Sequence, residues 1–166
     1  MPSDSSCSLW SEKDGPFFRE IVFIPILQSS QHCVSTSLAI LTGQNPDYFQ
    51  GKINTQDPVS WSNYLNPFGK KLAYCPSDIR RIDFYLPELL KLDDLFLLCY
   101  YTHTEEILND PRKDGWLIGS HVVILHRDQV IDPAKGNSIE AHSHPAKSFH
   151  TKRIFRVLPL DHQRGL

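Results

Sequence analysis

The sequence predicts a single α+β domain, with helices in its first half and an antiparallel sheet towards its end. The chain has 166 residues, which is the length of one ordinary domain. In the first half, apolar residues recur at helical spacing, as at positions 34, 38 and 41. The last third is richer in Val and Ile and contains short apolar runs separated by turn residues, as strands do. Helices followed by strands are typical of an α+β layout rather than of alternating βαβ units.

The composition is typical of a folded, soluble protein. Hydrophobic residues make up 40% of the chain and charged residues 22%, close to the average for globular domains. The 17 Lys and Arg against 19 Asp and Glu give a net charge of −2, so no excess of positive charge favours nucleic acid as a partner. No apolar run is long enough to cross a bilayer, and the N-terminus lacks the features of a secretory signal. We therefore expect a cytoplasmic protein without a membrane span.

The cysteines support the same compartment. Cys7, Cys33, Cys75 and Cys99 are at least 24 residues apart and include no C-x-x-C pair, which excludes a zinc ribbon or a thioredoxin-like motif. Four cysteines are too few for a disulfide scaffold in a chain of this length, so free thiols are expected. Cys99 lies in an apolar run and is expected to be a buried thiol that packs like a small hydrophobic residue.

The N-terminal part of the chain is expected to be irregular. Residues 1–16 are rich in Ser, Asp and Gly, which predicts a flexible lead-in to a single domain formed by residues 17–166. Residues 17–26 are apolar and β-branched, which predicts an extended segment. Pro25 assigns this segment to the edge or the end of a sheet, because proline cannot donate to a strand ladder.

A helix is predicted from Cys33 to Leu41, after a polar break at residues 28–31. Gly43 is a suitable C-terminal stop for it. Ser30 is a candidate cap for the unpaired N–H groups of its first turn. Cys33 is therefore expected in or beside the first turn of this helix.

The middle of the chain predicts short helices. Between residues 45 and 71, Pro and Gly alternate with aromatic residues, which indicates short helices and loops around one or two aromatic anchors. Ser77-Asp78 is expected to cap a short helix. Residues 86–90 predict another helix, with Pro87 near its start.

Four strands are predicted after these helices, over residues 95–101, 120–126, 129–131 and 154–160. Arg127-Asp128 is predicted to join the second and third strands in a tight hairpin. The basic residues near the C-terminus predict a solvated strand face; they are Lys147, Lys152, Arg153 and Arg156.

Four residues have the types and the order that thiol catalysis needs, namely a thiol, a base, a group that orients the base and a donor for the oxyanion. Cys33 lies where the partial positive charge of a helix N-terminus favours an anion. His121 begins one strand of the predicted hairpin and Asp132 ends the other, so their side chains are expected to meet on one face. Gln28 precedes the helix, and we expect its amide and the backbone N–H of Cys33 to stabilise an oxyanion.

The segments that carry these residues resemble those of papain-like cysteine peptidases. They are Leu27–Cys33 with the apolar helix after it, Ser120–Leu125 and Val130–Pro133. The resemblance is greatest to the C39-like branch, the bacteriocin-processing peptidases, and extends over roughly residues 22–135. It implies a papain-like fold in which the nucleophile helix packs on a C-terminal antiparallel sheet. It also implies the site roles: Cys33 as nucleophile, His121 as general base, Asp132 as its orienting group and Gln28 as oxyanion donor.

The activity implied by the resemblance is that of a thiol-dependent hydrolase or acyl transferase without a cofactor. Its substrate would be a protein or peptide, attacked at a peptide bond, an isopeptide bond or a glutamine side-chain amide. Proteolysis, deamidation and transamidation use the same apparatus, so the resemblance does not separate them. A bacterial effector or toxin, delivered to another cell by a non-classical route, is one setting that fits this small enzyme.

Two other interpretations stay open from the sequence, as does the oligomeric state. The family usually has Gly after the cysteine where this chain has Val34, and the interval from Gln28 to Cys33 is one residue short. Both departures fit a papain-like module that binds a peptide or protein without turning it over. The other interpretation is a metal-dependent hydrolase built on the C-terminal histidines His142, His144 and His150.

Overall fold

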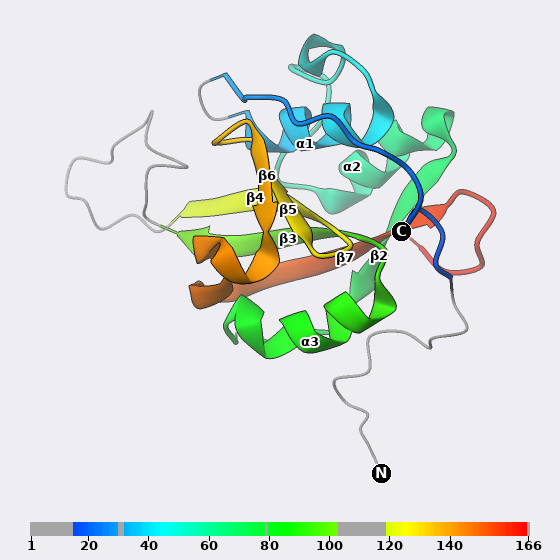
Figure 1. Cartoon of the computed structure of the whole chain (residues 1–166). Helices are drawn as coiled ribbons and strands as arrows, with labels where there is room; N and C mark the ends of the chain where they lie inside the picture. Colours follow the sequence, from blue (N-terminus) through cyan, green and yellow to red (C-terminus); the bar gives the residue numbers. More distant parts are fainter. Residues whose placement is uncertain (1–14, 30–31, 79, 103–118, 166) are drawn as a thin grey trace.

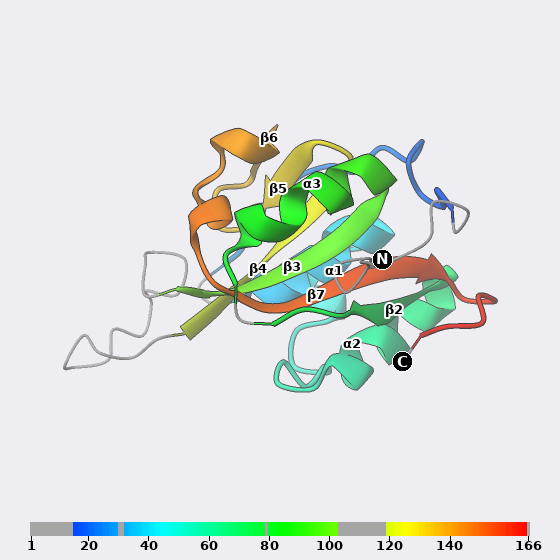
Figure 2. The same ribbon diagram turned by 90° about the horizontal axis from the view of Figure 1, so that it is seen from below.

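The computed structural model describes residues 15–29, 32–78, 80–102 and 119–165 (Figure 1). Most of the predicted lead-in, including Cys7, and the predicted cap Ser30 lie outside the described residues. Within them, helices pack on both faces of an antiparallel sheet, which confirms the α+β class. Helices α1 (Cys33–Thr42) and α2 (Pro58–Leu65) cover one face, and α3 (Ile82–Leu92) covers the other (Figures 1 and 2).

The sheet has six strands in the order β2-β7-β3-β4-β5-β6, and every neighbouring pair is antiparallel. β3 and β4 lie at its centre and carry the longest ladder. The strands are β2 (Lys70–Cys75), β3 (Leu95–Thr102), β4 (Gly119–His126), β5 (Gln129–Asp132), β6 (Asn137–Glu140) and β7 (Thr151–Pro159).

Alternation along the strands gives each face its own core. On the α1 face, Leu38 packs in one cluster with Leu97 and other odd-numbered residues of β3. On the α3 face, Leu89 packs in a second cluster with Leu98 and its even-numbered neighbours. The sheet is therefore packed between helices on both faces. Residues of α1 and β4 share the core on the α1 face, and this packing sets the position of α1 relative to β4.

α1 begins at Cys33 and stops at Gly43, both as predicted, but its cap differs. Gly43 has a φ of 75°, and its N–H bonds to the Ala39 carbonyl at 2.8 Å, so it is the C-terminal stop. The N-cap is His32 rather than Ser30, and the His32 side chain makes no capping hydrogen bond. Cys33 is therefore the first residue of the helix.

The structure contains two strands that were not predicted, β2 and β6. Because β2 precedes α3, the helices do not all come before the strands, as the sequence had suggested. β2 lies between α2 and α3 in the sequence. It begins with two lysines, so the buried Leu72 and Ala73 do not stand out as part of an apolar strand. β6 is a short polar edge strand with no buried residue. Residues 17–26, expected to be extended at a sheet edge, lie outside the sheet altogether.

The prediction for α3 was also wrong in two respects. Its N-cap is Arg81, so Ser77-Asp78 does not cap it, and the Asp78 carboxylate instead accepts a hydrogen bond from the Tyr85 hydroxyl at 2.5 Å. Pro87 lies in the middle of the helix rather than near its start. The short intermediate helices before β2 were predicted correctly.

A buried ion pair joins the N-terminal part of the chain to the sheet. Arg156 is fully buried on β7 and donates to Asp94 Oδ2 at 2.7 Å, so its assignment to a solvated strand face was wrong. Asp94 also accepts the backbone N–H groups of Phe17 at 2.9 Å and Phe18 at 2.8 Å. The entry segment, which we define as residues 17–29, is therefore anchored at its start.

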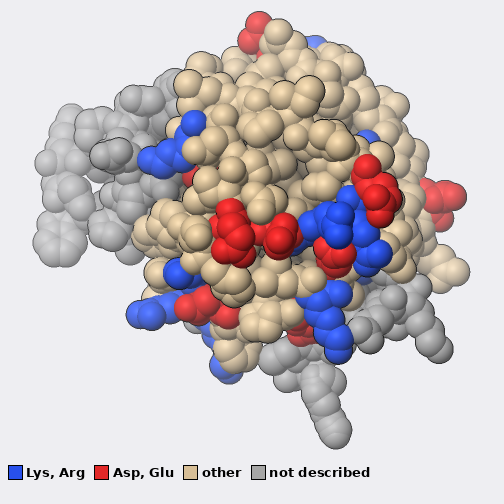
Figure 3. Space-filling model, in the orientation of Figure 1, with Lys and Arg blue, Asp and Glu red and all other residues tan. Residues whose placement is uncertain are grey.

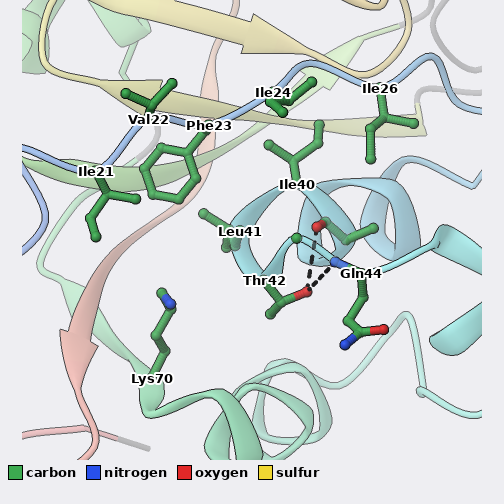
Figure 4. A pocket seen from close by; sticks show the side chains of 12 residues that line it. Ile21, Val22, Phe23, Ile24, Ile26, Ile40, Leu41, Thr42, Gln44 and Lys70 are labelled. Atoms are coloured by element: carbon green, nitrogen blue, oxygen red, sulfur yellow. Dashed lines mark hydrogen bonds between the residues drawn. The ribbon is translucent and has the colours of Figure 1, made fainter.

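An apolar hollow of about 390 Å³ is lined by the entry segment and by α1, as Figure 4 shows. Ile21, Phe23 and Ile24 line it from the segment, and Ile40 and Leu41 line it from the C-terminal half of α1. Because a helix rises 1.5 Å per residue, this hollow lies roughly 12 Å along α1 from Cys33.

The surface carries both signs of charge. On the face in Figure 3, acidic and basic side chains lie next to one another rather than in a patch of one sign. No helix in the described part of the chain has the length and apolar character that a membrane span requires.

Candidate active site

The hairpin of β4 and β5 brings His121 and Asp132 together. Arg127-Asp128 forms the turn as predicted, with Arg127 at a φ of 59°, and the register pairs Ile124 with Ile131. Both side chains are fully buried, and His121 Nε2 lies 2.8 Å from Asp132 Oδ1. The predicted contact between this imidazole and this carboxylate is therefore present.

The Asp132 carboxylate is held by three N–H groups. Besides His121, Oδ1 accepts the backbone N–H of Ala134 at 2.9 Å, and Oδ2 lies 2.7 Å from Nε2 of His144. Burial acts to raise the pKa of Asp132, but the hydrogen bonds from the two histidines outweigh it and hold that pKa well below its usual range. Asp132 is an anion at neutral pH.

Cys33 is the third member of the cluster. Burial acts to lower the pKa of His121, but the hydrogen bond to Asp132 and the proximity of Cys33 raise it to about 9. Since Nε2 is engaged with Asp132, Nδ1 is the ring nitrogen left for the thiol. Nδ1 is buried and has no hydrogen-bond partner among the described residues.

The thiol of Cys33 differs from the other described thiols in its exposure. Cys33 is half-buried at the start of α1, whereas Cys75 and Cys99 are buried, and all three are free. Cys99 packs in the core, which confirms the expectation of a buried thiol there, and burial raises its pKa to about 12. Among the described cysteines, Cys33 alone is open to a reagent or substrate.

Gln28 lies beside the end of β5. Its backbone N–H donates to the Pro133 carbonyl at 2.7 Å. A Cβ at Gly136, whose φ is 69°, would lie 2.9 Å from Leu27 Cβ, so the loop after Asp132 and the entry segment touch closely. The segment is thus anchored at this end too. The catalytic role of the Gln28 amide stays a prediction.

The sequence did not point to His144 as a member of this cluster. It was grouped with His142 and His150, but those two are exposed while His144 is buried against Asp132. In the described segments, no group of three or more potential ligands is arranged to hold a metal ion. The one local signal is the following Pro145, which makes His144 the N-cap of a short 3-10 helix, Pro145–Ser148.

The stability of the fold should depend on pH through His121. Its pKa is about 9 in the folded chain against 6.5 for the free side chain, so protonated His121 stabilises the fold fully below pH 6.5. That contribution is lost as pH rises through 9. At about 1.4 kcal/mol per pKa unit, the free energy of unfolding should fall by roughly 3 kcal/mol more in the wild type than in His121→Gln between pH 6 and pH 10. Urea unfolding measures this difference, and a constant difference across that range would contradict the raised pKa.

The sequence matches no protein-family model and no curated protein. The case for a function therefore rests on the residues themselves. They form an α+β domain with a buried Asp132–His121 pair beside an accessible cysteine at the start of a helix.

Proposed function

We propose that this protein is a cysteine-dependent acyl-transfer enzyme of papain-like fold that acts on an amide of a protein or peptide. The observation that carries the proposal is the buried imidazole of His121, which is hydrogen-bonded through Nε2 to the Asp132 carboxylate and leaves Nδ1 without a partner among the described residues. Cys33 lies close enough to this imidazole to raise its pKa. A base held by a carboxylate next to a thiol at a helix N-terminus is the arrangement that nucleophilic catalysis requires.

The reaction follows from these positions. With the pKa of His121 at about 9, the proton of Cys33 lies on Nδ1 of His121 before attack. The Cys33 thiolate attacks the amide carbon, so that a carbon–sulfur bond forms and the carbonyl electrons move to oxygen. The backbone N–H of Cys33 and the amide of Gln28 stabilise this oxyanion. When it collapses, the carbon–nitrogen bond breaks and the leaving amine takes its proton from imidazolium His121. Water, deprotonated by His121, then attacks the thioester and releases the thiolate.

The substrate class is a peptide bond, an isopeptide bond or a glutamine side-chain amide. All three present an amide carbonyl and a nitrogen leaving group to the same four residues, and an amine in place of water gives transamidation. Besides water, the steps use three side chains and one backbone N–H group of this chain, with Asp132 holding the imidazole. A bacterial effector or toxin that modifies a protein of another cell is the biological setting that we propose.

Alkylation of Cys33 tests the proposal. Iodoacetamide should alkylate Cys33 at pH 6 about tenfold faster in the wild type than in His121→Ala. An ordinary thiol with a pKa near 8.5 is ~0.3% ionised at that pH, and the lower nucleophilicity of an activated thiolate offsets part of the gain in ionised fraction. The measurement is the site-resolved alkylation rate by peptide mass spectrometry from pH 5 to pH 10.

The matched control is His32→Ala, which removes the exposed histidine next to Cys33 and should leave the rate unchanged. Equal, slow alkylation of Cys33 in the wild type and His121→Ala would reject the enzyme and favour the binding module. Val34, one of the departures behind that alternative, packs in the core on the α1 face, where its bulk is accommodated.

A further inference from the structure

Asp132 is shared by two histidines, and their second ring nitrogens meet different groups. In His144, Nδ1 accepts the backbone N–H of Ala146 at 2.9 Å. In His121, Nδ1 has no hydrogen-bond partner among the described residues, and Cys33 is the neighbouring group that raises the pKa of the ring. The two imidazoles therefore cannot exchange roles, although both bond the same carboxylate.

The contact with Ala146 defines the proton on His144. A backbone N–H can only donate, so Nδ1 of His144 must be unprotonated in order to accept it. The proton then lies on Nε2, which donates to Asp132 Oδ2 at 2.7 Å. His144 is a neutral imidazole of one tautomer, held in place by the start of the Pro145–Ser148 helix.

We propose that His144 is a positioning residue of the site: its Nε2–H holds one oxygen of Asp132, so that the other oxygen faces His121. This inference rests on the proposed function, because it assigns His144 a part in orienting the base. A carboxylate bonded through only one oxygen can rotate about its Cβ–Cγ bond, whereas donors on both oxygens fix its plane.

The groups around Asp132 and His121 in the described part of the chain include two titratable neighbours besides His144, namely Cys33 and Tyr100. Asp132 interacts with His121, His144 and the N–H of Ala134. His121 interacts with Asp132 and Cys33, and the ring of Tyr100 stands edge-on to it at 5.7 Å between centroids. A change at His144 therefore reaches Cys33 through Asp132 and His121.

A pair of isosteric variants tests the proposal. In His144→Gln, the amide nitrogen takes the place of Nε2 and can donate to Asp132. In His144→Asn, the shorter amide takes the place of Nδ1 and cannot reach it. We expect alkylation of Cys33 at pH 6 to fall about tenfold in His144→Asn and by less than about threefold in His144→Gln, since a hydrogen bond to a charged group is at stake.

The pH profile separates positioning from a merely structural role. In His144→Asn the NMR titration of His121 should move to lower pH by about one unit, because its contact with the carboxylate weakens. In His144→Gln it should stay near the wild-type value. The control is His142→Asn, which changes an exposed histidine of the neighbouring short helix and should alter neither readout.

The outcomes are distinguishable. Wild-type Cys33 that reacts no faster than in His121→Ala defeats the proposed function itself. A reactive wild type with no difference between His144→Asn and His144→Gln overturns the role of His144 alone. If His144→Asn does not fold, the ¹⁵N NMR spectrum of the His144 ring in the wild type tests the proposal instead. A proton on Nε2 and an unprotonated Nδ1 at pH 7 support it, and a proton on Nδ1 overturns it.

Discussion

Replacing Asp132 with asparagine is expected to lower the pKa of His121 from about 9 to below its ordinary value of 6.5. The substitution removes the carboxylate that favours the imidazolium, while the burial that disfavours it remains. In the mechanism that we propose, His121 without that carboxylate cannot hold the proton of Cys33. Turnover of an amide substrate should fall about 10³–10⁴-fold.

Neither orientation of an asparagine amide suits this site. With its oxygen at the Oδ1 position, the NH₂ group meets Nε2–H of His144, whose tautomer is held by Ala146. With its oxygen at the Oδ2 position, the NH₂ group meets the N–H of Ala134 and Nε2–H of His121. One donor therefore always faces another donor. An unsatisfied buried donor costs about 1–3 kcal/mol, so the variant should also be less stable.

NMR titration of His121 in wild type and Asp132→Asn measures the first effect. Urea unfolding at pH 7 measures the second. The conservative control is Asp128→Asn, a change in the exposed hairpin turn, where the Asp128 carboxylate accepts a hydrogen bond from the Gln129 side chain. A His121 ring that still titrates above pH 8 in Asp132→Asn would show that Asp132 is not the source of its raised pKa.

Replacing Asp94 with alanine is expected to lower the free energy of unfolding by about 3–5 kcal/mol. The substitution leaves the guanidinium of Arg156 buried without its carboxylate, between the rings of Phe17 and Phe96. It also removes the acceptor for the backbone N–H groups of Phe17 and Phe18. The entry segment should therefore detach at its start, and trypsin should cleave after Arg19 faster than in the wild type.

Asp93→Asn is the matched control for Asp94→Ala. Asp93 pairs with Arg19 and Arg127 at the surface, where ion pairs contribute about 0–1 kcal/mol. Asparagine also tolerates the left-handed backbone at this position, where φ is 53°. The double variant Asp94→Leu, Arg156→Met should recover most of the stability, because it removes both charges together. A loss below about 1 kcal/mol in Asp94→Ala would mean that the pair does not stabilise the fold.

Local pattern was enough to place the principal parts of the candidate site. The apolar spacing after Cys33 predicted α1, and Gly43 predicted its end. The turn at Arg127-Asp128 set the register of the hairpin, and the register in turn brought His121 to Asp132. These features depend on neighbours along the chain, for which helical spacing and turn geometry are reliable signals.

The remaining features depend on partners far away in the sequence. The sequence of β2 gives only a weak strand signal, and its extended conformation depends on pairing with β7, where Lys70 lies opposite Pro159. From the sequence, Arg156 is expected at the surface, and only the structure shows that it is buried in an ion pair with Asp94. A charged or polar side chain is buried only where a partner compensates its desolvation, and no local pattern reveals that partner.

His144 is the clearest example of this limit. A histidine before a proline looks like an ordinary loop residue, and nothing near it in the sequence indicates that its Nε2 faces Asp132. The fold decides this, because the chain after β6 turns back over the end of β5 and leaves the ring one acceptor, a carboxylate oxygen 2.7 Å away. The amino-acid order alone was sufficient for the thiol, the imidazole and the carboxylate; the second imidazole on that carboxylate follows only from how the chain packs, since the hydrogen bonds of a buried group are satisfied in space and not along the chain.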